Sequence, residues 1–325
     1  AVNGPAIHAV SLLQFAPFLA KRDIDVLAFF SRRGFSPNVF QRHDDWLPRD
    51  FCFGLANALV EETGDPFAGA LLGDQIPVLR FGEFGERLAR TETVLTCCTT
   101  TIRNLGLVHR GSRMTARIER GRYIMRYELE GALADAPWQF LLATMAVLHN
   151  IVLLAGEPDR VKVRLSLPRS RHTAALEATF GGNLEFGCDH DEIEIRQDLL
   201  DKPMELLTRP SRTDQALETT IHTALRVARR LPSGEVGIDG TAADLGLTRR
   251  TLQRRLADCG VLFSDLIDIT RRDIAMRRLL EGCDNLKALS ADLGYSDPSH
   301  FTRTFRRWTG MAPSDYRAPV LSEAF

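Results

Sequence analysis

The chain has 325 residues, which is enough for two domains because a single hydrophobic core usually stops growing at roughly 250 to 300 residues. Hydrophobic residues make up 44% and charged residues 26% of the sequence, which excludes a largely disordered chain and favours a globular protein with a buried core. Lys plus Arg (41) and Asp plus Glu (42) nearly cancel, so the net charge indicates no nucleic-acid partner. Any such indication must come from local arrangement.

From residue 7 to about residue 100 the pattern is mostly helical, with helix endings paired with turn-forming residues. The apolar segment from Ile7 to Ala20 lacks the basic start of a secretory signal, and we expect a helix that ends or bends near Pro17. The six cysteines include no C-x-x-C pair and are expected to be reduced, buried thiols. For the adjacent Cys97 and Cys98, a redox switch is the alternative to simple burial.

The following residues mix strands with helices. Residues 112–130 alternate between apolar and polar side chains on both sides of Arg120 and Gly121, which predicts a β-hairpin. An apolar helix is expected over 138–155; it is shorter than the roughly 20 residues that a membrane span needs, so we predict a soluble protein. A strand over 161–167, a short helix near 171–180 and two brief strands near 184–195 complete a predicted α+β domain.

No pattern of catalysis or cofactor binding stands out in this half. The segment from Cys188 to Glu192 groups several metal-ligand residue types, but we favour an acidic surface turn over a metal site. The sequence contains no G-x-G-x-x-G, G-x-S-x-G or H-E-x-x-H motif. We therefore predict no catalytic residues, no metal and no cofactor.

Two helix-turn-helix units are predicted near the C-terminus. In the first, Thr241 to Thr248 forms a short helix, a turn at Gly246 and an N-cap for the next helix. That next helix, from Arg249 to Asp258, has two leucines four residues apart on its inner face. The side chains left facing outward suit hydrogen bonding to base edges: Arg249, Arg250, Gln253 and Arg254.

The second unit repeats this design about 48 residues later, and such a repeat is harder to obtain by chance than a single match. Leu286 to Tyr295 is the predicted supporting helix with its turn, and residues 296–298 begin the next helix. Phe301 and Phe305 are expected to pack inward. The predicted DNA-facing side chains are Ser299, His300, Thr302, Arg303 and Arg306.

Between the units, residues 264–281 are predicted to form one helix, roughly 27 Å long at about 1.5 Å per residue. This length suits two recognition helices about 34 Å apart, which is one turn of B-DNA. We therefore predict that one chain contacts two adjacent major grooves; a solvated basic face is the alternative for each helix. The change from a mixed to an all-helical pattern at Pro210 predicts domains of residues 1–209 and 210–325.

These C-terminal residues resemble the AraC family of transcription regulators over residues 213–317. The most specific run extends from Leu293 to Gly310 and continues from Pro313 to Arg317, and Leu245 to Leu256 also matches. Thr241 and Ser290 depart from the family, which usually has an aliphatic residue and an alanine there. The resemblance implies that the base-reading positions are Arg250, Gln253, Arg254, Ser299, His300 and Arg303.

The N-terminal region resembles the arabinose-binding-type sensor domain of ornithine and arginine utilisation regulators. The matching segments are Gly34 to Pro37, Thr63 to Pro66 and Phe81 to Gly85, whereas Glu86 to Arg90 replaces the small residues that usually follow. The resemblance implies a domain that binds a small-molecule effector, dimerises the protein and changes how the DNA-binding half engages a promoter. The effector-binding residues are unknown at this stage.

The leading hypothesis is a ligand-responsive transcription activator in the cytoplasm. Its expected partners are double-stranded promoter DNA, a small-molecule effector, RNA polymerase and a second copy of the chain, with no membrane. An enzyme whose N-terminal domain turns over a metabolite is a competing hypothesis, although the sequence offers no nucleophile, metal or nucleotide motif for it. A repressor or architectural protein that senses no ligand is the third.

Overall fold

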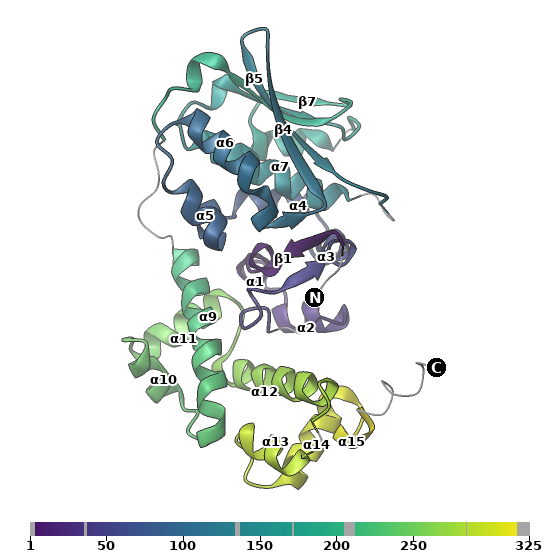
Figure 1. Cartoon of the computed structure of the whole chain (residues 1–325), viewed down its shortest axis with the longest axis vertical. Coiled ribbons are helices and arrows are strands. Elements are labelled where there is room, and N and C mark those ends of the chain that lie inside the picture. Colours follow the sequence, from purple (N-terminus) through teal and green to yellow (C-terminus); the bar gives the residue numbers. More distant parts are fainter. Residues whose placement is uncertain are drawn as a thin grey trace. The chain divides into compact units, whose positions relative to one another are not determined.

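The computed structural model describes residues 4–35, 38–133, 137–170, 172–204, 212–283 and 285–316. The chain divides into two compact units (Figure 1). Unit 1 is formed by residues 1–18 and 43–214, and unit 2 by residues 19–42 and 215–325. The predicted boundary at Pro210 lies outside the described residues. The limits 1–209 and 210–325 therefore stay a prediction.

A five-stranded sheet forms one layer of unit 1. Its order is β4-β5-β8-β6-β7, antiparallel except for β6 and β7. The predicted hairpin is confirmed, because Arg120 and Gly121 have φ values of 48° and 75°, the left-handed turn conformation that suits the twist of paired strands. The strands are β4 Ser112–Glu119, β5 Arg122–Leu129, β6 Val161–Leu165, β7 Leu184–Phe186 and β8 Asp191–Arg196.

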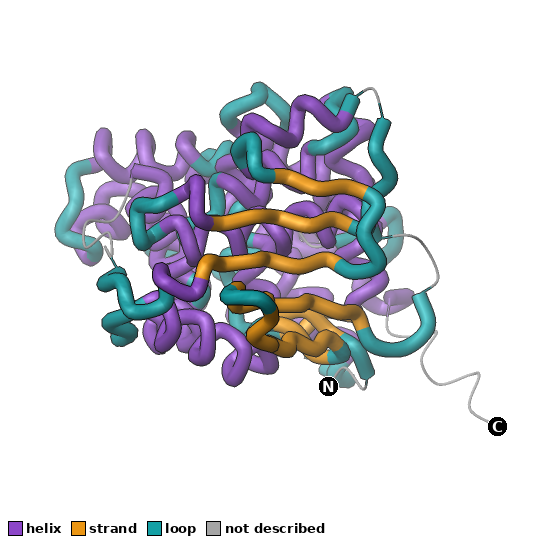
Figure 2. Tube along the Cα trace, turned by 90° about the horizontal axis from the view of Figure 1, so that it is seen from above, coloured by secondary structure: helices purple, strands orange, loops and turns teal. Residues whose placement is uncertain are grey.

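Helices cover one face of this sheet, as Figure 2 shows with the strands seen face on and helices behind them. Strand residues such as Val163 and Ile193 are buried against α7 (Trp138–Leu153), the predicted apolar helix. Helix α4 (Ala68–Asp74) packs closely on α7, because Gly69 and Gly73 have no Cβ. A Cβ at either glycine would lie 2.1 or 2.2 Å from a carbonyl oxygen of α7.

The prediction of a helix from Ile7 to Ala20 is wrong in its first half. Strand β1 (Ala6–His8) pairs with β2 (Trp46–Pro48) and β3 (His109–Arg110) in a small antiparallel sheet, order β2-β1-β3. Pro17 does not end the helix α1 (Phe15–Ala20). It is the third helical residue, where backbone N–H groups have no acceptor within the helix.

Other helices of unit 1 contact these sheets, among them α3 (Arg49–Thr63), which packs on β1 and β2, and α6 (Val94–Asn104), which packs on β4. The expected helix near 171–180 is a 3-10 turn, η5 (Thr173–Leu176), followed by α8 (Glu177–Phe180). The remaining elements are α5 Gly82–Leu88 and the 3-10 turns η1 Ala9–Leu12, η2 Val78–Arg80, η3 Leu105–Leu107, η4 Pro158–Arg160 and η6 Gln197–Leu199.

Unit 2 is helical within the described residues. The predicted helix 249–258 is found with those bounds, and the predicted linker 264–281 is α12 (Phe263–Leu280), which connects α10 and α11 to α13–α15 (Figure 1). The helices are α2 Val26–Arg32, α9 Arg212–Arg230, α10 Ile238–Asp244, α11 Arg249–Asp258, α13 Leu286–Asp292, α14 Pro298–Thr309 and α15 Pro313–Tyr316, with the 3-10 turn η7 Leu231–Ser233.

Residues 19–42 belong to unit 2 although they are far in sequence from its other residues, 215–325. The side-chain amide of Asn38 donates to the hydroxyl of Thr270 on α12 over 3.2 Å, and both side chains are fully buried. Val26, at the start of α2, lies so close to Gly260 that a Cβ there would come within 2.6 Å of its methyl group. Buried contacts therefore tie this segment to the C-terminal helices.

No helix among the described residues combines the length and the apolar character that crossing a bilayer requires.

Candidate nucleic-acid interface

The first helix-turn-helix unit consists of α10 and α11. Gly246, between them, has φ = 65°, a left-handed conformation that glycine adopts without strain. The hydroxyl of Thr248 accepts a hydrogen bond of 3.2 Å from the backbone N–H of Thr251, which caps α11. Leu252 and Leu256 are buried, so the opposite side of α11 is left outward.

All four predicted side chains of α11 are exposed: Arg249, Arg250, Gln253 and Arg254. Arg249 forms an exposed ion pair of 3.3 Å with Asp239 on α10. Arg255, on the other side, donates to Gln215 and Thr219 of α9 over 3.1 and 3.0 Å. Its guanidinium therefore anchors α11 to α9, whereas the predicted residues lie on the solvent side.

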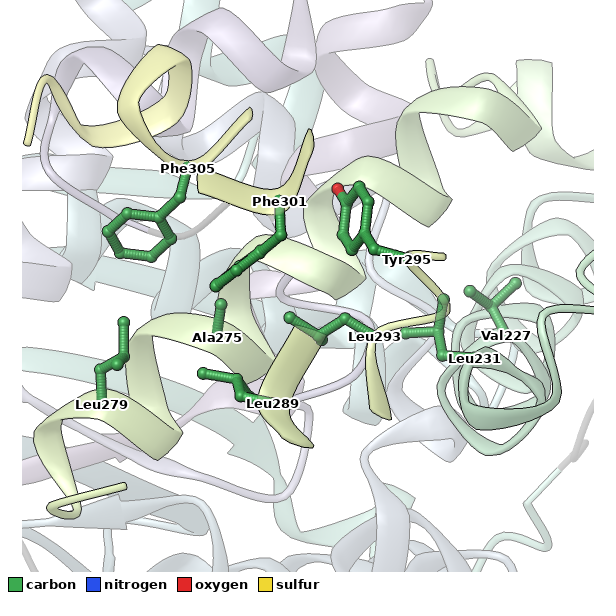
Figure 3. Close-up of a cluster of buried hydrophobic side chains, with 9 residues drawn as sticks. All are labelled: Val227, Leu231, Ala275, Leu279, Leu289, Leu293, Tyr295, Phe301 and Phe305. Carbon is green, nitrogen blue, oxygen red and sulfur yellow. The ribbon is translucent and has the colours of Figure 1, made fainter. Parts of the chain in front are cut away.

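The second unit consists of α13 and α14. Gly294, in the turn, has φ = 75°. The carboxylate of Asp297 accepts a 2.9 Å hydrogen bond from the N–H of Ser299, which caps α14 and lowers the pKa of Asp297. Phe301 and Phe305 pack inward as predicted, within the buried cluster that Figure 3 shows.

The predicted side chains of α14 differ in their surroundings. Four are exposed: Ser299, His300, Arg303 and Arg306. Thr302 is half-buried, and its hydroxyl donates to the carbonyl oxygen of Pro298 over 3.0 Å. The ring of His300 meets Tyr295 edge to face, 5.3 Å between centroids, so this histidine is supported by the core while remaining accessible.

A buried cluster of side chains connects the two helix-turn-helix units. The cluster in Figure 3 includes Val227 and Leu231 from α9 and η7, residues of α12, and the inner faces of α13 and α14. The carbonyl oxygen of Leu231 approaches Gly294 so closely that a Cβ there would lie 2.5 Å away. Arg230, next to Leu231, forms a 2.7 Å ion pair with Asp244 of α10. The end of α9 thus contacts both helix-turn-helix units.

Arg271 of α12 adds to this connection. Its guanidinium donates to the carbonyl oxygen of Leu293 over 3.0 Å and lies 4.9 Å from the centroid of the Tyr295 ring. Arg230 and Arg271 could not be identified from the sequence, because an arginine on a helix is most often solvated and no local signal distinguishes these two. Their partners become visible only in the folded chain.

The two departures from the family pattern have different outcomes. Thr241 is buried, and its hydroxyl donates to the carbonyl oxygen of Gly237 over 2.9 Å. Ser290 is equally buried, but its hydroxyl has no hydrogen-bond partner among the described residues. A buried hydroxyl without a partner typically costs about 1 to 3 kcal/mol relative to a satisfied one.

Two of the metal-ligand residues between Cys188 and Glu192 are engaged by protein groups. Asp191 accepts hydrogen bonds from the N–H and hydroxyl of Ser166. Glu192 is buried and accepts from three arginines over 2.7 to 2.9 Å: Arg117, Arg126 and Arg164. Burial alone would raise the pKa of Glu192, but these hydrogen bonds lower it. In the part of the chain that the structure describes, no group of three His, Cys, Asp or Glu side chains is arranged to hold a metal ion.

All six cysteines are thiols that form no disulfide; Cys97 and Cys98 are both buried, whereas Cys188 and Cys283 are only half-buried. Burial raises the pKa of Cys97 to about 11 and that of Cys98 further. The thiolate is the reactive form of cysteine, and burial disfavours it here. The structure therefore supports the interpretation of Cys97 and Cys98 as simply buried thiols over that of a redox switch.

Comparisons with known proteins agree with this arrangement. A family profile described as "Helix-turn-helix domain" matches residues 241–319. The chain is 26% identical over 331 aligned positions to the ornithine utilization regulator of Pseudomonas aeruginosa, and 96% of each chain is covered. It is 26% identical over 334 positions to the HTH-type transcriptional regulator VirS of Mycobacterium tuberculosis, with 97% of each covered.

Among solved structures, the chain is similar to the transcriptional regulator CdpR from Pseudomonas aeruginosa, with 22% identity and a TM-score of 0.37 over 92% of this chain and 98% of that one. A second profile, "Arabinose-binding domain of AraC transcription regulator, N-term", matches residues 24–204. Since that match alone spans more than half of the 325 residues, the chain belongs to the AraC family of transcription regulators.

Proposed function

We propose that this regulator is a ligand-responsive activator whose helices α11 and α14 enter two successive major grooves of promoter DNA. The observation that carries the proposal is the matched pair of helices, each with a buried apolar side and an exposed side rich in arginine. The 18 residues of α12, at about 1.5 Å each, provide a rod of roughly 27 Å between them. That length suits grooves about 34 Å apart.

The exposed side chains have the chemistry for reading base edges. Arginine donates two parallel hydrogen bonds to guanine, and a glutamine such as Gln253 pairs with adenine in the same bidentate manner. We assign base contacts to Arg250, Gln253, Arg254, Ser299, His300 and Arg303, with Arg249, Thr302 and Arg306 at the edge of the same surfaces. The remaining positive charge faces phosphates, which makes binding sensitive to salt.

The rest of the proposal concerns regulation. Unit 1 contains most of the sensor-type domain, and we assign it effector binding and homodimer formation. RNA polymerase is the proposed partner of the DNA-bound form, and we assign the chain no catalytic activity. A full chain that converts a metabolite in the absence of DNA would favour the competing enzyme hypothesis.

The DNA-binding proposal is tested with Arg254→Ala and Arg303→Ala, one from each helix. DNA ligands are first selected from a random pool by the wild-type chain and then titrated by fluorescence anisotropy. Each variant should lose about 1 to 3 kcal/mol, or roughly 5- to 150-fold in affinity, because a bidentate base contact is removed. Arg277→Ala is the matched control, an exposed arginine on α12 outside both surfaces.

The control should change affinity by much less than either test variant. If Arg254→Ala and Arg303→Ala bind the selected DNA as the wild type does, the assigned surfaces are wrong. If only one of them matters, a single groove is read and the two-groove proposal fails. In a DNA footprinting experiment, the wild type should protect two segments about one helical turn apart. Loss of one of these segments in each arginine variant would support simultaneous contact with both grooves.

A further inference from the structure

Unit 1 contains an apolar cavity of about 80 Å³ that the DNA-binding proposal does not use. Its wall is formed by α3, α6, α7 and the segment from β1 to α1, together with residues around α5. Aromatic and aliphatic side chains dominate, among them Phe15, Phe84, Phe140 and Leu148. The lining, all within the described part of unit 1, includes no Lys, Arg, Asp or Glu.

The polar side chains of the lining include Thr101 and Thr144 as well as Ser11 and His109, and the last two have hydrogen-bonding capacity that matters for a ligand. The hydroxyl of Ser11 is buried and has no partner among the described residues. Nδ1 of His109 lies 3.1 Å from the hydroxyl oxygen of Tyr127, which itself donates to Ser112 over 3.0 Å. Because that phenolic proton is directed at Ser112, Nδ1 of His109 must be the donor, which leaves Nε2 as an acceptor.

The remaining electrostatics of the cavity are neutral. Burial lowers the pKa of His109 to about 4, so the imidazole is uncharged at neutral pH. Burial raises the pKa of Cys52, another lining residue, to about 12, so its thiol stays protonated. A bound carboxylate or ammonium group would therefore be desolvated without a counter-charge, and the few polar side chains of a mostly apolar lining would leave several hydroxyls of a sugar without a partner.

We propose that this cavity is the effector site, and that it takes a small, neutral, mostly apolar molecule whose single hydroxyl or N–H group donates to Nε2 of His109. This inference rests on the proposed ligand-responsive function and names its ligand class. It differs from what the sensor-domain name and the ornithine-related relative would suggest, since arabinose is polyhydroxylated and ornithine is charged. A phenol-like molecule has the required combination of one donor and an apolar body.

The size of the cavity adds a physical consequence. At about 80 Å³ it is roughly half the volume of the engineered apolar cavity, about 150 Å³, that binds benzene. A single ring therefore enters only if side chains such as Phe15 or Phe84 move outward. Phe15 begins α1, whose last two residues, Leu19 and Ala20, belong to unit 2. Outward movement of Phe15 would therefore act on a helix whose chain continues into the DNA-binding unit.

The test uses thermal unfolding of the full chain with phenol, toluene, benzoate, L-arabinose and L-ornithine as probes. Phenol should raise the unfolding midpoint saturably, by roughly 5 to 10 °C at about 100 times its Kd, because it binds only the folded state. Toluene should give a smaller shift, since it fills the cavity without donating a hydrogen bond. The charged and polyhydroxylated probes should give none. A shift with arabinose or ornithine but not with phenol would overturn the assignment.

Two variants separate cavity binding from surface adsorption. Ala56→Leu places additional methyl groups in the cavity from α3 and should abolish the shifts with phenol and toluene. Ala178→Leu makes the same change at an exposed position of α8 and should leave them intact. His109→Phe should equalise phenol and toluene by removing the acceptor. If phenol keeps its advantage in that variant, His109 does not bind the hydroxyl.

DNA binding by the same samples distinguishes this inference from the proposed function. If no probe shifts the midpoint while Arg254→Ala still weakens DNA binding, the cavity is a packing void and the DNA-reading assignment stands. If phenol stabilises the chain but neither arginine variant alters DNA binding, the reverse holds. Both parts are supported together if phenol stabilises the wild type and also changes its affinity for the selected DNA.

Discussion

Gly246 and Gly294 occupy equivalent turns, but only Gly294 lies against another backbone segment. Alanine variants of the two therefore measure the free-energy cost of that close contact. Both glycines have a positive φ, 65° and 75°, so an alanine at either position is held in a conformation that costs roughly 1 to 2 kcal/mol. The reduced entropy of the unfolded alanine chain offsets about 0.4 to 1 kcal/mol of this. For Gly246→Ala, whose added Cβ meets no atom within 4 Å, we expect a net loss of about 1 kcal/mol.

Gly294→Ala should cost considerably more. Its Cβ would lie 2.5 Å from the carbonyl oxygen of Leu231, a backbone atom that cannot rotate away as a flexible side chain would. Forcing this contact apart adds about 1 to 3 kcal/mol, as overpacking does in other cores. We therefore expect about 3 kcal/mol in total and a difference of about 2 kcal/mol between the two variants.

Urea unfolding followed by circular dichroism measures both losses, provided that the slope m is unchanged. Because Leu231 directly follows Arg230, the last residue of α9, displacement at Gly294 should also disturb how the two helix-turn-helix units are held. The affinity for selected DNA should then fall more for Gly294→Ala than for Gly246→Ala. Equal losses of stability in the two variants would refute the argument that Leu231 and Gly294 are in tight contact.

Three further predictions concern other buried groups. Glu192→Gln removes the carboxylate that three arginines share, and we expect a loss of roughly 3 kcal/mol at neutral pH. Because the folded-state pKa of Glu192 is lowered, its contribution is lost as the pH falls through that pKa, and urea titrations should show the variant approaching the wild type in acid. Thr270→Val removes the hydroxyl that accepts from Asn38 and should lower the urea midpoint by the equivalent of about 1 kcal/mol; no change would mean that this contact contributes nothing. In a thiol-labelling time course followed by mass spectrometry, half-buried Cys188 should react in the native protein and Cys98 only after denaturation, since burial raises the pKa of Cys98; early labelling of Cys98 would restore the redox interpretation.

The sequence predicted best what local chemistry determines. The bounds of α11 follow from the Thr248 cap and the glycine turn before it, and both signals lie within a few residues of the helix. The hairpin around Arg120 and Gly121 could be predicted for the same reason, because the alternating strand residues and the turn residues are adjacent in the sequence. The outward faces of α11 and α14 were predictable for the same reason, because each helix has two apolar side chains four residues apart that are buried on its opposite side.

Features that depend on distant partners were missed. Strand β1 has only three residues, too few for an alternating pattern, and exists through pairing with segments about forty and a hundred residues away. Ser11 and His109, two polar residues of the cavity lining, are about a hundred positions apart in the sequence. Arg271 has a typical surface composition around it and is recognised as part of the connection between the helix-turn-helix units only through its bond to Leu293.

The membership of residues 19–42 in unit 2 has a practical meaning for anyone who dissects this regulator. A fragment cut near Pro210 would leave behind Asn38 and Val26, and would expose the surfaces around Thr270 and Gly260 that they cover. The helix-turn-helix half is therefore not one continuous segment that could be moved into another protein with a single junction. Chimeric regulators built from this chain should retain residues 19–42 together with residues 215–325. Otherwise, the apolar side chains that become exposed should be replaced by polar ones.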